Sequence, residues 1–392
     1  DGKWIDYPLK MQSALKAIGP VTAARAVADY GRAQAQHKIR PAEIKSMKDA
    51  YVLQYGYTLY SLFFDGYSQK VWGMSPEKLS ADWVSQRTKG MSLMTAVKDA
   101  IVPSKGEVVS LIDEFMYPRD GFGRFSDRMA DRIIESGNEI RLKTAVEKIV
   151  LDGNRVKGIQ VRTENGSEFI EGKNFVSSIP LTVLCKITDP PAPVDVIAAA
   201  DSLTFRDIIT VNLMFKKRQV TNDTWVYVHD RNILFGRFHE PKNWSPAMVP
   251  SDDFTSLVVE YFCTKGDHIW SMTDEQLVNQ TVKHLVEDLK FVEPQEVIGG
   301  FTVRATKAYP TYDLGYKEPL ERMKNYIASI ENLQYIGRGG SFRYNNTDHS
   351  IETGLLAAKN LLGEHHNLEK VNTDGEYHEI KRVAQPASQA IH

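Results

Sequence analysis

The residues best suited to chemistry lie in one stretch near the C-terminus, residues 333–351. A short apolar run there ends in Gly337-Arg338-Gly339-Gly340. A loop rich in Arg and Asn then leads to Thr347 or Asp348, either of which can cap a helix. The start of a helix presents unpaired backbone N–H groups and a partial positive charge, so this stretch predicts a site for an anion or for a flavin ring that becomes negative on reduction. Four side chains are expected to form the buried stripe of the helix: Ile351, Leu355, Ala358 and Leu362.

A second interpretation of the same stretch needs no ligand. A glycine turn before a capped helix is common, and Arg338 and Arg343 would then be solvated. His349 is the one histidine near this candidate site, either as a helix-start residue or as an acid–base group. The pair His365-His366 beside Glu364 has no cysteine or third spaced ligand with it, so we predict no metal site.

Aromatic residues dominate a second stretch, Phe63–Gly73, with the sequence FFDGYSQKVWG. A planar aromatic ring stacks on a nucleobase at little entropic cost, and a phenol adds a hydrogen bond. Core packing suits Phe63 and Phe64 better than ligand contact does. Tyr67 and Trp72, at the end of the expected helix, fit contact with a base.

Two further stretches carry weaker signals. Tyr117–Gly123, with the sequence YPRDGFG, has the composition of an ordinary Pro-Asp-Gly turn before a helix. Tyr309-Pro310, followed by Tyr312 and Asp313, places an aromatic cluster just beyond an expected strand. Neither stretch alone predicts a ligand.

Taken in order along the chain, these stretches resemble UDP-galactopyranose mutase and the amine-oxidase-like and protoporphyrinogen-oxidase-like flavoenzymes. The resemblance spans residues 1 to about 363 and implies a Rossmann-like FAD-binding domain beside a substrate cleft. Asn346 stands where the mutase pattern has Asp, Ser68 where it has Thr and Asp120 where it has Gly. A larger departure is that no G-x-G-x-x-G motif occurs, and no acidic residue follows one.

The resemblance also assigns site residues, one position at a time. Arg338 would contact the flavin, and Tyr344 would reach the diphosphate of a substrate. The protein groups considered for catalysis are His349 and Arg343, although the flavin is expected to carry the chemistry. The cofactor-binding positions it implies are Val146, Ser178, Gly337, Arg338, Gly339, Asn346, Asp348, Ser350 and Ile351. The substrate-binding positions it implies are Phe64, Tyr67, Trp72, Tyr309 and Tyr344.

Composition limits the class of protein. The 392 residues include 48 Lys and Arg against 50 Asp and Glu, so there is no basic field for binding nucleic acid. No apolar run reaches the roughly 20 residues that a membrane-spanning helix needs. The two cysteines, Cys185 and Cys263, argue against a disulfide framework and favour a reducing compartment, so we expect a cytoplasmic protein.

The elements that must position these residues give a mixed α/β fold. We expect a helical substrate-binding lobe (1–104), an FAD-binding α/β part with a β-meander (105–180) and an antiparallel-sheet substrate domain (181–329). A C-terminal FAD-binding strand, loop and helix (330–363) would precede a polar, frayed tail (364–392). The FAD-binding domain is thus split in sequence and, lacking the glycine fingerprint, incomplete.

Within these parts, Ser126 and Gly137 are expected to bound one helix, Thr273 to cap another, and the meander to turn at 152–154 and 164–166. The first residues, Asp1–Pro8, are expected to form an edge strand already in progress. We therefore expect a fragment or processed product, with a possible separate N-terminal piece that carries the ADP-binding motif.

Three functions remain open at this stage. The first is an FAD enzyme of the mutase type, acting on a UDP-sugar or related small molecule, with NAD(P)H as a possible reductant. The second is an amine-oxidase-like or protoporphyrinogen-oxidase-like dehydrogenase, and oxidoreductase chemistry is the broader prediction. The third is a cofactor-free pseudoenzyme or scaffold, which the missing fingerprint favours and the Gly337–Asp348 loop opposes. The sequence does not give the oligomeric state.

Overall fold

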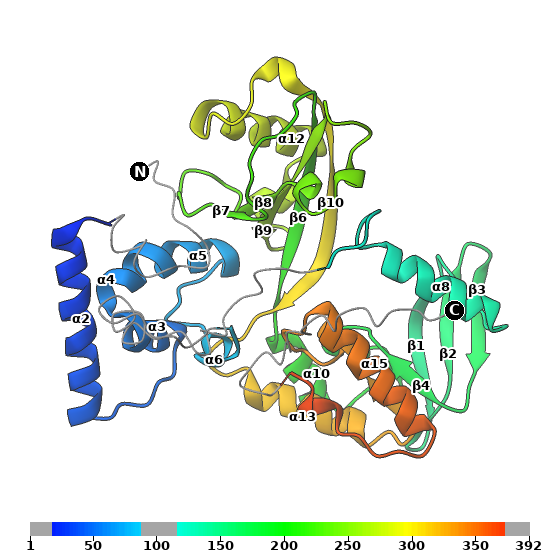
Figure 1. Cartoon of the computed structure of the whole chain (residues 1–392). Helices are drawn as coiled ribbons and strands as arrows, with labels where there is room; N and C mark the ends of the chain where they lie inside the picture. The colour runs from blue at the N-terminus through cyan, green and yellow to red at the C-terminus, as the bar shows by residue number, and fades with distance from the viewer. Residues whose placement is uncertain (1–17, 88–115, 373–392) are drawn as a thin grey trace, which may run out of the picture.

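The computed structural model describes residues 18–87 and 116–372. These residues form a helical lobe, an antiparallel sheet lobe and an α/β unit around a shared centre (Figure 1). The combination of helices with mixed and antiparallel sheets confirms the predicted fold class. The strand expected at Asp1–Pro8 lies outside the described residues, and the domain boundaries at 104, 180, 329 and 363 stay predictions.

The helical lobe packs around tyrosines. Tyr51 and Tyr55 are buried, and Phe64 stacks on both, with ring centroids 4.3 and 4.9 Å away. Ser46 begins one helix with a capping box closed by Asp49. The helices of the lobe are α2 (Pro20–Ile39), α3 (Met47–Tyr55), α4 (Tyr57–Leu59), the π-helical turn η1 (Tyr60–Asp65), α5 (Gly66–Trp72) and α6 (Asp82–Arg87).

The sheet lobe contains a five-stranded antiparallel sheet in the order β10-β6-β9-β8-β7. Its strands are β6 (Phe205–Phe215), β7 (Val226–Tyr227), β8 (Arg237–His239), β9 (Thr255–Cys263) and β10 (Val297–Pro310). Leu277 and Leu285 pack with the alternate side chains of β6 and β9 in one apolar core. They come from α12 (Asp274–Lys283), which begins at the predicted Thr273 capping box, and from the π-helical turn η4 (His284–Asp288).

Short segments complete the connections of the sheet lobe. They are η2 (Pro241–Asn243), η3 (Pro246–Met248), α11 (His268–Ser271) and η5 (Pro294–Glu296). The loop between β6 and β7 is held by the buried carboxylate of Glu240, just after β8, which accepts from the Val220 and Thr221 N–H groups at 3.1 and 2.8 Å. The Thr255 hydroxyl also donates to this carboxylate. Such satisfied polar groups fix a loop over an apolar core.

A bulge on β10 sets the end of the sheet that faces the centre. The register with β6 shifts between Ala305 and Tyr309, and Lys307 adopts a left-handed backbone conformation, with φ of 54°. Asp207, a buried residue of β6, accepts the Lys307 N–H at 2.6 Å and so stabilises the bulge. Because a bulge changes the direction of the side chains after it, it determines where Tyr309 points.

The α/β unit contains two sheets. One has the order β3-β2-β1-β5, with β1 (Ala145–Asp152), β2 (Arg155–Thr163), β3 (Gly166–Glu171) and β5 (Thr188–Asp189). The predicted meander is confirmed, with turns at Gly153 and Gly166, both at positive φ. The other is a parallel pair, β4 (Phe175–Ser177) and β11 (Leu333–Tyr335). Among the described residues, β4 pairs with β11 alone.

Helices surround these sheets. They are α8 (Arg124–Glu135), α9 (Leu181–Leu184), α10 (Val194–Ser202), α13 (Lys317–Ala328), α14 (Gly337–Gly340), α15 (Thr347–Leu361) and the turn η6 (Leu368–Lys370). Two predicted caps are wrong, since α8 has Gly123 rather than Ser126 at its N-cap and α15 has Asn346 rather than Thr347 or Asp348. Both cysteines are buried with free thiols. No described helix has the length and apolar composition needed to span a bilayer.

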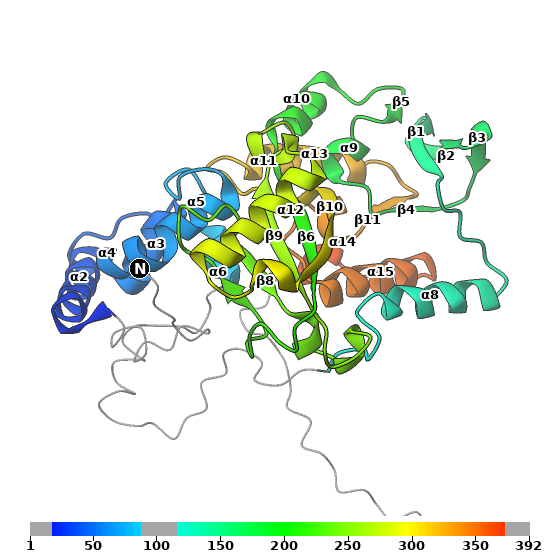
Figure 2. The ribbon, with the colours of Figure 1, turned by 90° about the horizontal axis from the view of Figure 1, so that it is seen from above.

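The expected buried stripe on α15 is also wrong. Ile351, Leu355 and Leu362 are 37%, 61% and 86% exposed, and the helix buries Thr353 and Ala357 instead. On α8 no residue is buried, and Phe125 is half exposed. Both helices lie on the same side of the α/β unit (Figures 1 and 2). Apolar spacing alone predicted the stripe, and the described residues contain no layer that covers it.

Candidate functional site

Two tyrosines and an arginine meet at the centre of the molecule. Tyr309 follows the β10 bulge, and Tyr344 lies in the loop between α14 and α15. Their rings are nearly parallel, at 21°, with centroids 5.6 Å apart. The Arg338 guanidinium carbon lies 5.1 Å from the Tyr309 ring and 5.0 Å from the Tyr344 ring. We call Tyr309 and Tyr344 the tyrosine pair, and its contact with Arg338 is a double cation–π arrangement.

Local backbone structure places Arg338. Gly337, at a φ of 75°, turns the chain out of β11 into α14, a conformation that favours glycine. The Arg338 side chain then donates from Nε to the Asn345 carbonyl at 2.6 Å and from Nη1 to the Ala308 carbonyl at 3.4 Å. Arg338 therefore joins the site loop to the bulged end of β10, and its charge is fixed beside the tyrosine pair.

A second arginine, Arg237 on β8, approaches Tyr309 from the sheet. Its Nη2 donates to the Tyr309 hydroxyl at 3.2 Å, and its guanidinium carbon lies 4.8 Å from the Trp225 ring centroid. Glu260, buried on β9, accepts from it at 2.8 Å. Burial acts to lower the pKa of Arg237, but the Glu260 carboxylate and the Tyr309 phenol outweigh it and raise that pKa. Burial has the opposite effect on a phenol and raises the pKa of Tyr309, so this phenol stays protonated.

Arg237 and Glu260 were not among the site residues predicted from the sequence. The signal available was a charged residue within each apolar strand run, 233–238 and 256–262. Such residues are rarely buried unless they are paired, so each one in a strand predicts a partner. Only the sheet register, Arg237 opposite Glu260, identifies that partner.

The aromatic residues of α5 line the next part of the centre. The Tyr67 ring lies 4.9 Å from the His229 ring and 5.8 Å from the Tyr227 ring. Burial raises the pKa of Tyr67 well above that of a free tyrosine. Lys70, one turn along α5, donates to the Val228 and Asp230 carbonyls at 2.8 and 2.6 Å. This clamp holds the loop after β7 against Tyr67.

The other predicted substrate residues lie deeper. Trp72 is 3% exposed, and its ring packs against Trp83 at 5.7 Å and against Tyr344 at 6.3 Å. Phe64 stacks on Tyr51 and Tyr55 within the helical lobe. Their placement favours support of Tyr344 by Trp72 and core packing of Phe64.

The start of α15 lies beside this cluster. Asn346 and His349 form a reciprocal cap, in which the Asn346 N–H donates to His349 Nδ1 at 3.2 Å. His349 is therefore engaged at the helix start, and Asp348 beside it is exposed. The Ser350 hydroxyl donates to the Asn346 carbonyl at 2.9 Å. Thr353 accepts the Gly337 N–H at 3.0 Å and ties the helix to the glycine turn.

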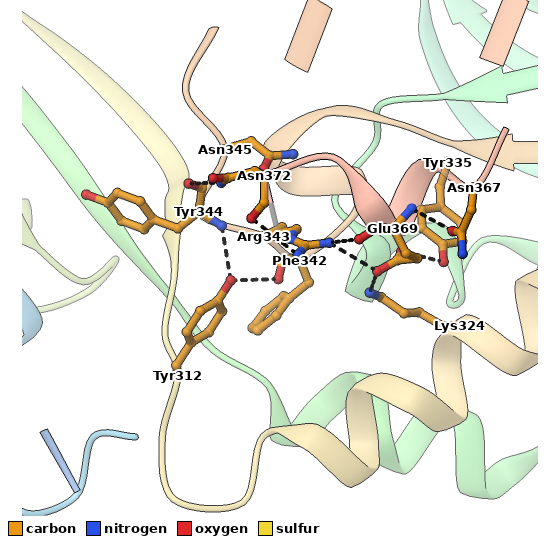
Figure 3. A network of polar contacts seen from close by, with 10 residues as sticks. All are labelled: Tyr312, Lys324, Tyr335, Phe342, Arg343, Tyr344, Asn345, Asn367, Glu369 and Asn372. Carbon is orange, nitrogen blue, oxygen red and sulfur yellow. Dashed lines mark hydrogen bonds and ion pairs between the residues drawn. The ribbon is translucent and has the colours of Figure 1, made fainter. Parts of the chain in front are cut away.

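Arg343 points away from the tyrosine pair. Figure 3 shows Tyr344 and Arg343 extending in opposite directions from the loop. Arg343 Nη1 donates to the Glu369 carbonyl at 2.5 Å, and the Glu369 carboxylate lies 3.6 Å from the same nitrogen. Arg343 is therefore not solvated as one interpretation expected, since its side chain is only 16% exposed. Its assignment to catalysis stays a prediction. The side chain binds the segment after α15.

Two other predicted cofactor positions lie on the α/β unit. Ser178 follows β4, in the turn on which α14 packs, where a Cβ at Gly340 would lie 3.1 Å from the Ser177 carbonyl oxygen. Gly339 packs on Pro180 of the same turn. Val146 lies on β1 at an irregularity of the β1–β2 pairing. The structure therefore brings Ser178, Gly337, Arg338 and Gly339 together and places Val146 on a separate sheet.

The Pro-Arg-Asp-Gly turn docks on the sheet lobe. Gly121, at a φ of 96°, closes the turn, and the Ser245 hydroxyl donates to the Arg119 carbonyl at 2.6 Å. Tyr117 packs edge-on against Trp244 at 5.2 Å. No cluster of three or more His, Cys, Asp or Glu side chains suited to a metal occurs within residues 18–87 and 116–372.

The residues at the centre fit a flavin. The 15-residue helix α15 begins there, and the N–H groups of its first turn with the Arg338 charge favour the electronegative edge of the ring system. Asn345 is 1% exposed, and its Nδ2 has no hydrogen-bond partner within the described part of the chain. A buried donor of this kind is stabilised when a ligand oxygen accepts from it.

Comparison with solved structures gives the fold a context. A crystal structure of reduced UDP-galactopyranose mutase matches with a TM-score of 0.76 at 19% identity, covering 95% of this chain and 80% of that one. A putative protoporphyrinogen oxidase from Exiguobacterium sp. 255-15 matches with a TM-score of 0.58 at 17% identity, covering 86% and 71%. Putrescine oxidase bound to putrescine matches with a TM-score of 0.54 at 14% identity, covering 88% and 76%.

The sequence similarity to one protein family extends over most of the chain and not over a single motif alone. Residues 49–362 match the family described as flavin containing amine oxidoreductase, and this range contains the tyrosine pair, Arg237, Arg338 and all of α15. The family implies FAD as the cofactor, in agreement with the residues at the start of α15. The chain belongs to the flavin containing amine oxidoreductase family.

Proposed function

We propose that this FAD-dependent enzyme of the amine oxidoreductase family acts on a nucleotide sugar, in the manner that the name UDP-galactopyranose mutase implies for its structural neighbour. The observation that carries the proposal is the convergence of Arg237 and Arg338 on the tyrosine pair. Two guanidinium groups and two phenols match the charge and the many acceptor oxygens of a diphosphate.

The charge balance supports an anionic substrate. Arg237 is compensated by Glu260, whereas the Arg338 side chain bonds to two neutral carbonyls. The groups around the tyrosine pair therefore sum to one net positive charge. An anion gains from this field, and a cationic amine is repelled by it.

The aromatic part of the centre would hold the base. Tyr67, Tyr227 and His229 form a group of rings on the α5 side of the tyrosine pair. In this proposal they stack on and hydrogen-bond uracil, while Arg237, Arg338 and Tyr344 hold the diphosphate. The bound flavin supplies the redox or nucleophilic chemistry, and the protein orients the sugar and excludes water.

An amine dehydrogenase or oxidase is the second candidate. The family match and the fold shared with putrescine oxidase favour it. In this alternative the tyrosine pair would receive an amine, and Arg338 would compete for the same ring faces. A cofactor-free scaffold is disfavoured by the buried, unpaired Asn345 donor. NAD(P)H as the reductant stays a prediction. The cytoplasmic location also stays a prediction, and the free thiols of the two buried cysteines are consistent with it.

FAD binding also requires a place for its ADP half. We propose that a strand–helix–strand segment with a glycine fingerprint, in the same polypeptide or a separate one, covers α8 and α15 and pairs with β4. Support comes from the exposed Phe125, Leu355 and Leu362 and from β4, which pairs with β11 alone among the strands that the structure describes. Such apolar faces on an α/β unit are normally covered by a further layer. Flavin absorbance of the chain alone, and with its natural flanking sequence, tests this proposal.

The substrate proposal is tested with uridine diphosphate as the probe in titration calorimetry. Arg237→Met and Arg338→Met each remove one charge, and each should weaken binding by about 2–3 kcal/mol, as loss of a charge-assisted contact does. Arg304→Met is the matched control, because Arg304 pairs with Asp274 at the sheet periphery. If the wild-type protein binds putrescine and not uridine diphosphate, the amine alternative replaces the proposal.

A further inference from the structure

The segment after α15, predicted to be a frayed tail, is built into the back of the site loop as far as it is described. Residues 367–372, which we call the strap, run against the loop 342–346 (Figure 3). The strap begins at Asn367, whose side chain accepts the Glu369 N–H at 3.0 Å. The apolar side chain of Val371 is buried. The strap is thus folded by its own cap and by packing.

The strap contacts three successive residues of the site loop. Arg343 Nη1 donates to the Glu369 carbonyl at 2.5 Å. Asn372 Nδ2 donates to the Tyr344 carbonyl at 3.3 Å and to Asn345 Oδ1 at 3.1 Å. The Asn345 carbonyl in turn accepts from Arg338 Nε at 2.6 Å. A continuous chain of hydrogen bonds therefore connects the strap to both Tyr344 and Arg338.

Charged groups fix the strap from its other side. The Glu369 carboxylate accepts from Lys324 on α13 at 2.5 Å and from the Tyr335 hydroxyl on β11 at 2.9 Å. Burial and the Glu369 charge raise the pKa of Tyr335, which keeps that phenol protonated as a donor. The strap is consequently anchored to the same α/β unit that carries the start of α15.

The site loop needs such support because its backbone is strained. Phe342, the first residue of the site loop, has a φ of 47°, in the left-handed region, and Asn372 of the strap has a φ of 58°. A non-glycine residue persists there only when its surroundings compensate the cost. Tyr312 compensates on the inner side, where its hydroxyl accepts the Tyr344 N–H at 3.0 Å. The strap compensates on the outer side.

We propose that Asn372 and Glu369 are positioning residues, which hold Tyr344 and Arg338 in the geometry that binds the substrate diphosphate. The inference rests on the proposed function for its ligand, but not for its structural part. Asn372 is the more direct of the two, since one amide group bonds to two successive residues of the loop. Glu369 acts through Arg343 and through the position of the strap.

Two substitutions of Asn372 test the proposal. Asn372→Gly keeps the left-handed backbone accessible and removes the amide, whereas Asn372→Asp keeps the shape and replaces the donor with a carboxylate. Both should weaken uridine diphosphate binding about three- to tenfold, the effect of lost neutral hydrogen bonds. Both should also accelerate amide hydrogen exchange at residues 343–346 about tenfold and change the near-ultraviolet circular dichroism of the aromatic centre.

Asn332→Ala is the matched control. Asn332 is a buried amide that bonds to the Val156 N–H and to the Val156 and Lys173 carbonyls, away from the site loop. It should destabilise the protein without changing exchange at 343–346. Equal loss of nucleotide binding in Asn332→Ala would overturn the proposal, because general destabilisation would then explain both results.

The remaining outcomes separate the claim about the substrate from the claim that the strap positions the site loop. If the wild-type protein does not bind uridine diphosphate, the proposed substrate is wrong, and the exchange rates at 343–346 still decide whether the strap holds the loop. If the nucleotide binds to the wild type and to both Asn372 variants equally, with unchanged exchange, the strap has no positioning role.

Discussion

The sheet lobe and the α/β unit differ in how completely each one buries its own apolar side chains. In the sheet lobe, β6, β9 and the α12–η4 helix enclose an apolar core within a single stretch of chain. In the α/β unit, β4 and β11 are three residues long and come from distant parts of the sequence. Within residues 18–87 and 116–372, α8 and much of α15 are left uncovered. A lobe that completes its own core can present side chains rigidly. A unit with an open apolar face depends on further contacts.

The largest expected difference between the two regions is in core truncation. Phe235 is fully buried and packs against Phe238, Tyr261 and His284. Phe235→Ala should lower the free energy of unfolding of the sheet lobe by about 3–5 kcal/mol. Phe125→Ala, on the exposed face of α8, should change it by less than about 0.5 kcal/mol. Urea denaturation of both variants measures this contrast, and similar losses would abolish the distinction.

The pH dependence of stability should also come from the sheet lobe. His239 stacks on Trp244 at 4.4 Å, and burial together with the Arg237 charge lowers the pKa of His239 to about 4. The unfolded chain binds a proton below about 6.5 and the native state does not. Stability is therefore lost as the pH falls from about 6.5 to about 4, by up to about 3 kcal/mol.

His239→Phe keeps the stacking and removes the proton. The variant should lose less stability than the wild type when urea denaturation is compared at pH 6.5 and pH 4. His365→Phe, on the exposed segment after α15, is the control and should keep the wild-type slope. A His239→Phe slope equal to that of the wild type would show that other groups dominate.

Two glycines of the α/β unit test how tightly α14 and α15 pack against their neighbours. A Cβ at Gly340 would lie 3.1 Å from the Ser177 carbonyl oxygen, whereas a Cβ at Gly354 would make only an ordinary contact, 3.7 Å from Ile336. Gly340→Ala should cost about 1–3 kcal/mol by pushing α14 off β4. Gly354→Ala, within α15, should stabilise by about 0.5–1 kcal/mol. Thermal unfolding distinguishes the signs, and stabilisation by both would mean that α14 moves freely.

The smallest expected effect concerns the open face itself. In the chain of 392 residues, without the covering segment proposed above, Met129→Gln on α8 and Leu355→Gln on α15 should change the free energy of unfolding by less than about 0.5 kcal/mol, because both side chains are exposed. The same changes should reduce binding of a hydrophobic dye such as anilinonaphthalene sulfonate. A loss of several kcal/mol would indicate that the face is covered in solution.

The sequence predicted local structure well where the signal itself was local. The Thr273 capping box and the turns at Gly153 and Gly166 are confirmed, because each depends on residues within four positions of one another. The glycine turn, Arg338 and the tyrosines were found from their spacing and a family resemblance. Their meeting at one centre required the fold.

The N-caps predicted at Ser126 and at Thr347 or Asp348 are local errors of one to three positions. The other errors come from contacts between distant residues. The side on which the α15 stripe lies depends on a covering layer, which no local period encodes. Arg343 turned outward because Glu369 and Asn372 accept from it, and both were assigned to a frayed tail on the basis of polarity alone. Arg237 and Glu260 were not predicted as site residues, because a single charged residue in a sequence is normally solvated. Only the strand register shows that the two residues lie opposite each other.

The two buried cysteines have a practical consequence for spectroscopy. Burial raises the pKa of both Cys185 and Cys263 to about 12, so neither thiol reacts readily with a maleimide at neutral pH. The chain contains no other cysteine. A single cysteine introduced on the exposed face of α15 would therefore take up a fluorophore selectively. Energy transfer from the tryptophans, which lie outside the α/β unit at Trp72, Trp83, Trp225, Trp244 and Trp270 among the described residues, would then report movement of the label relative to the two lobes. No native thiol would have to be removed first.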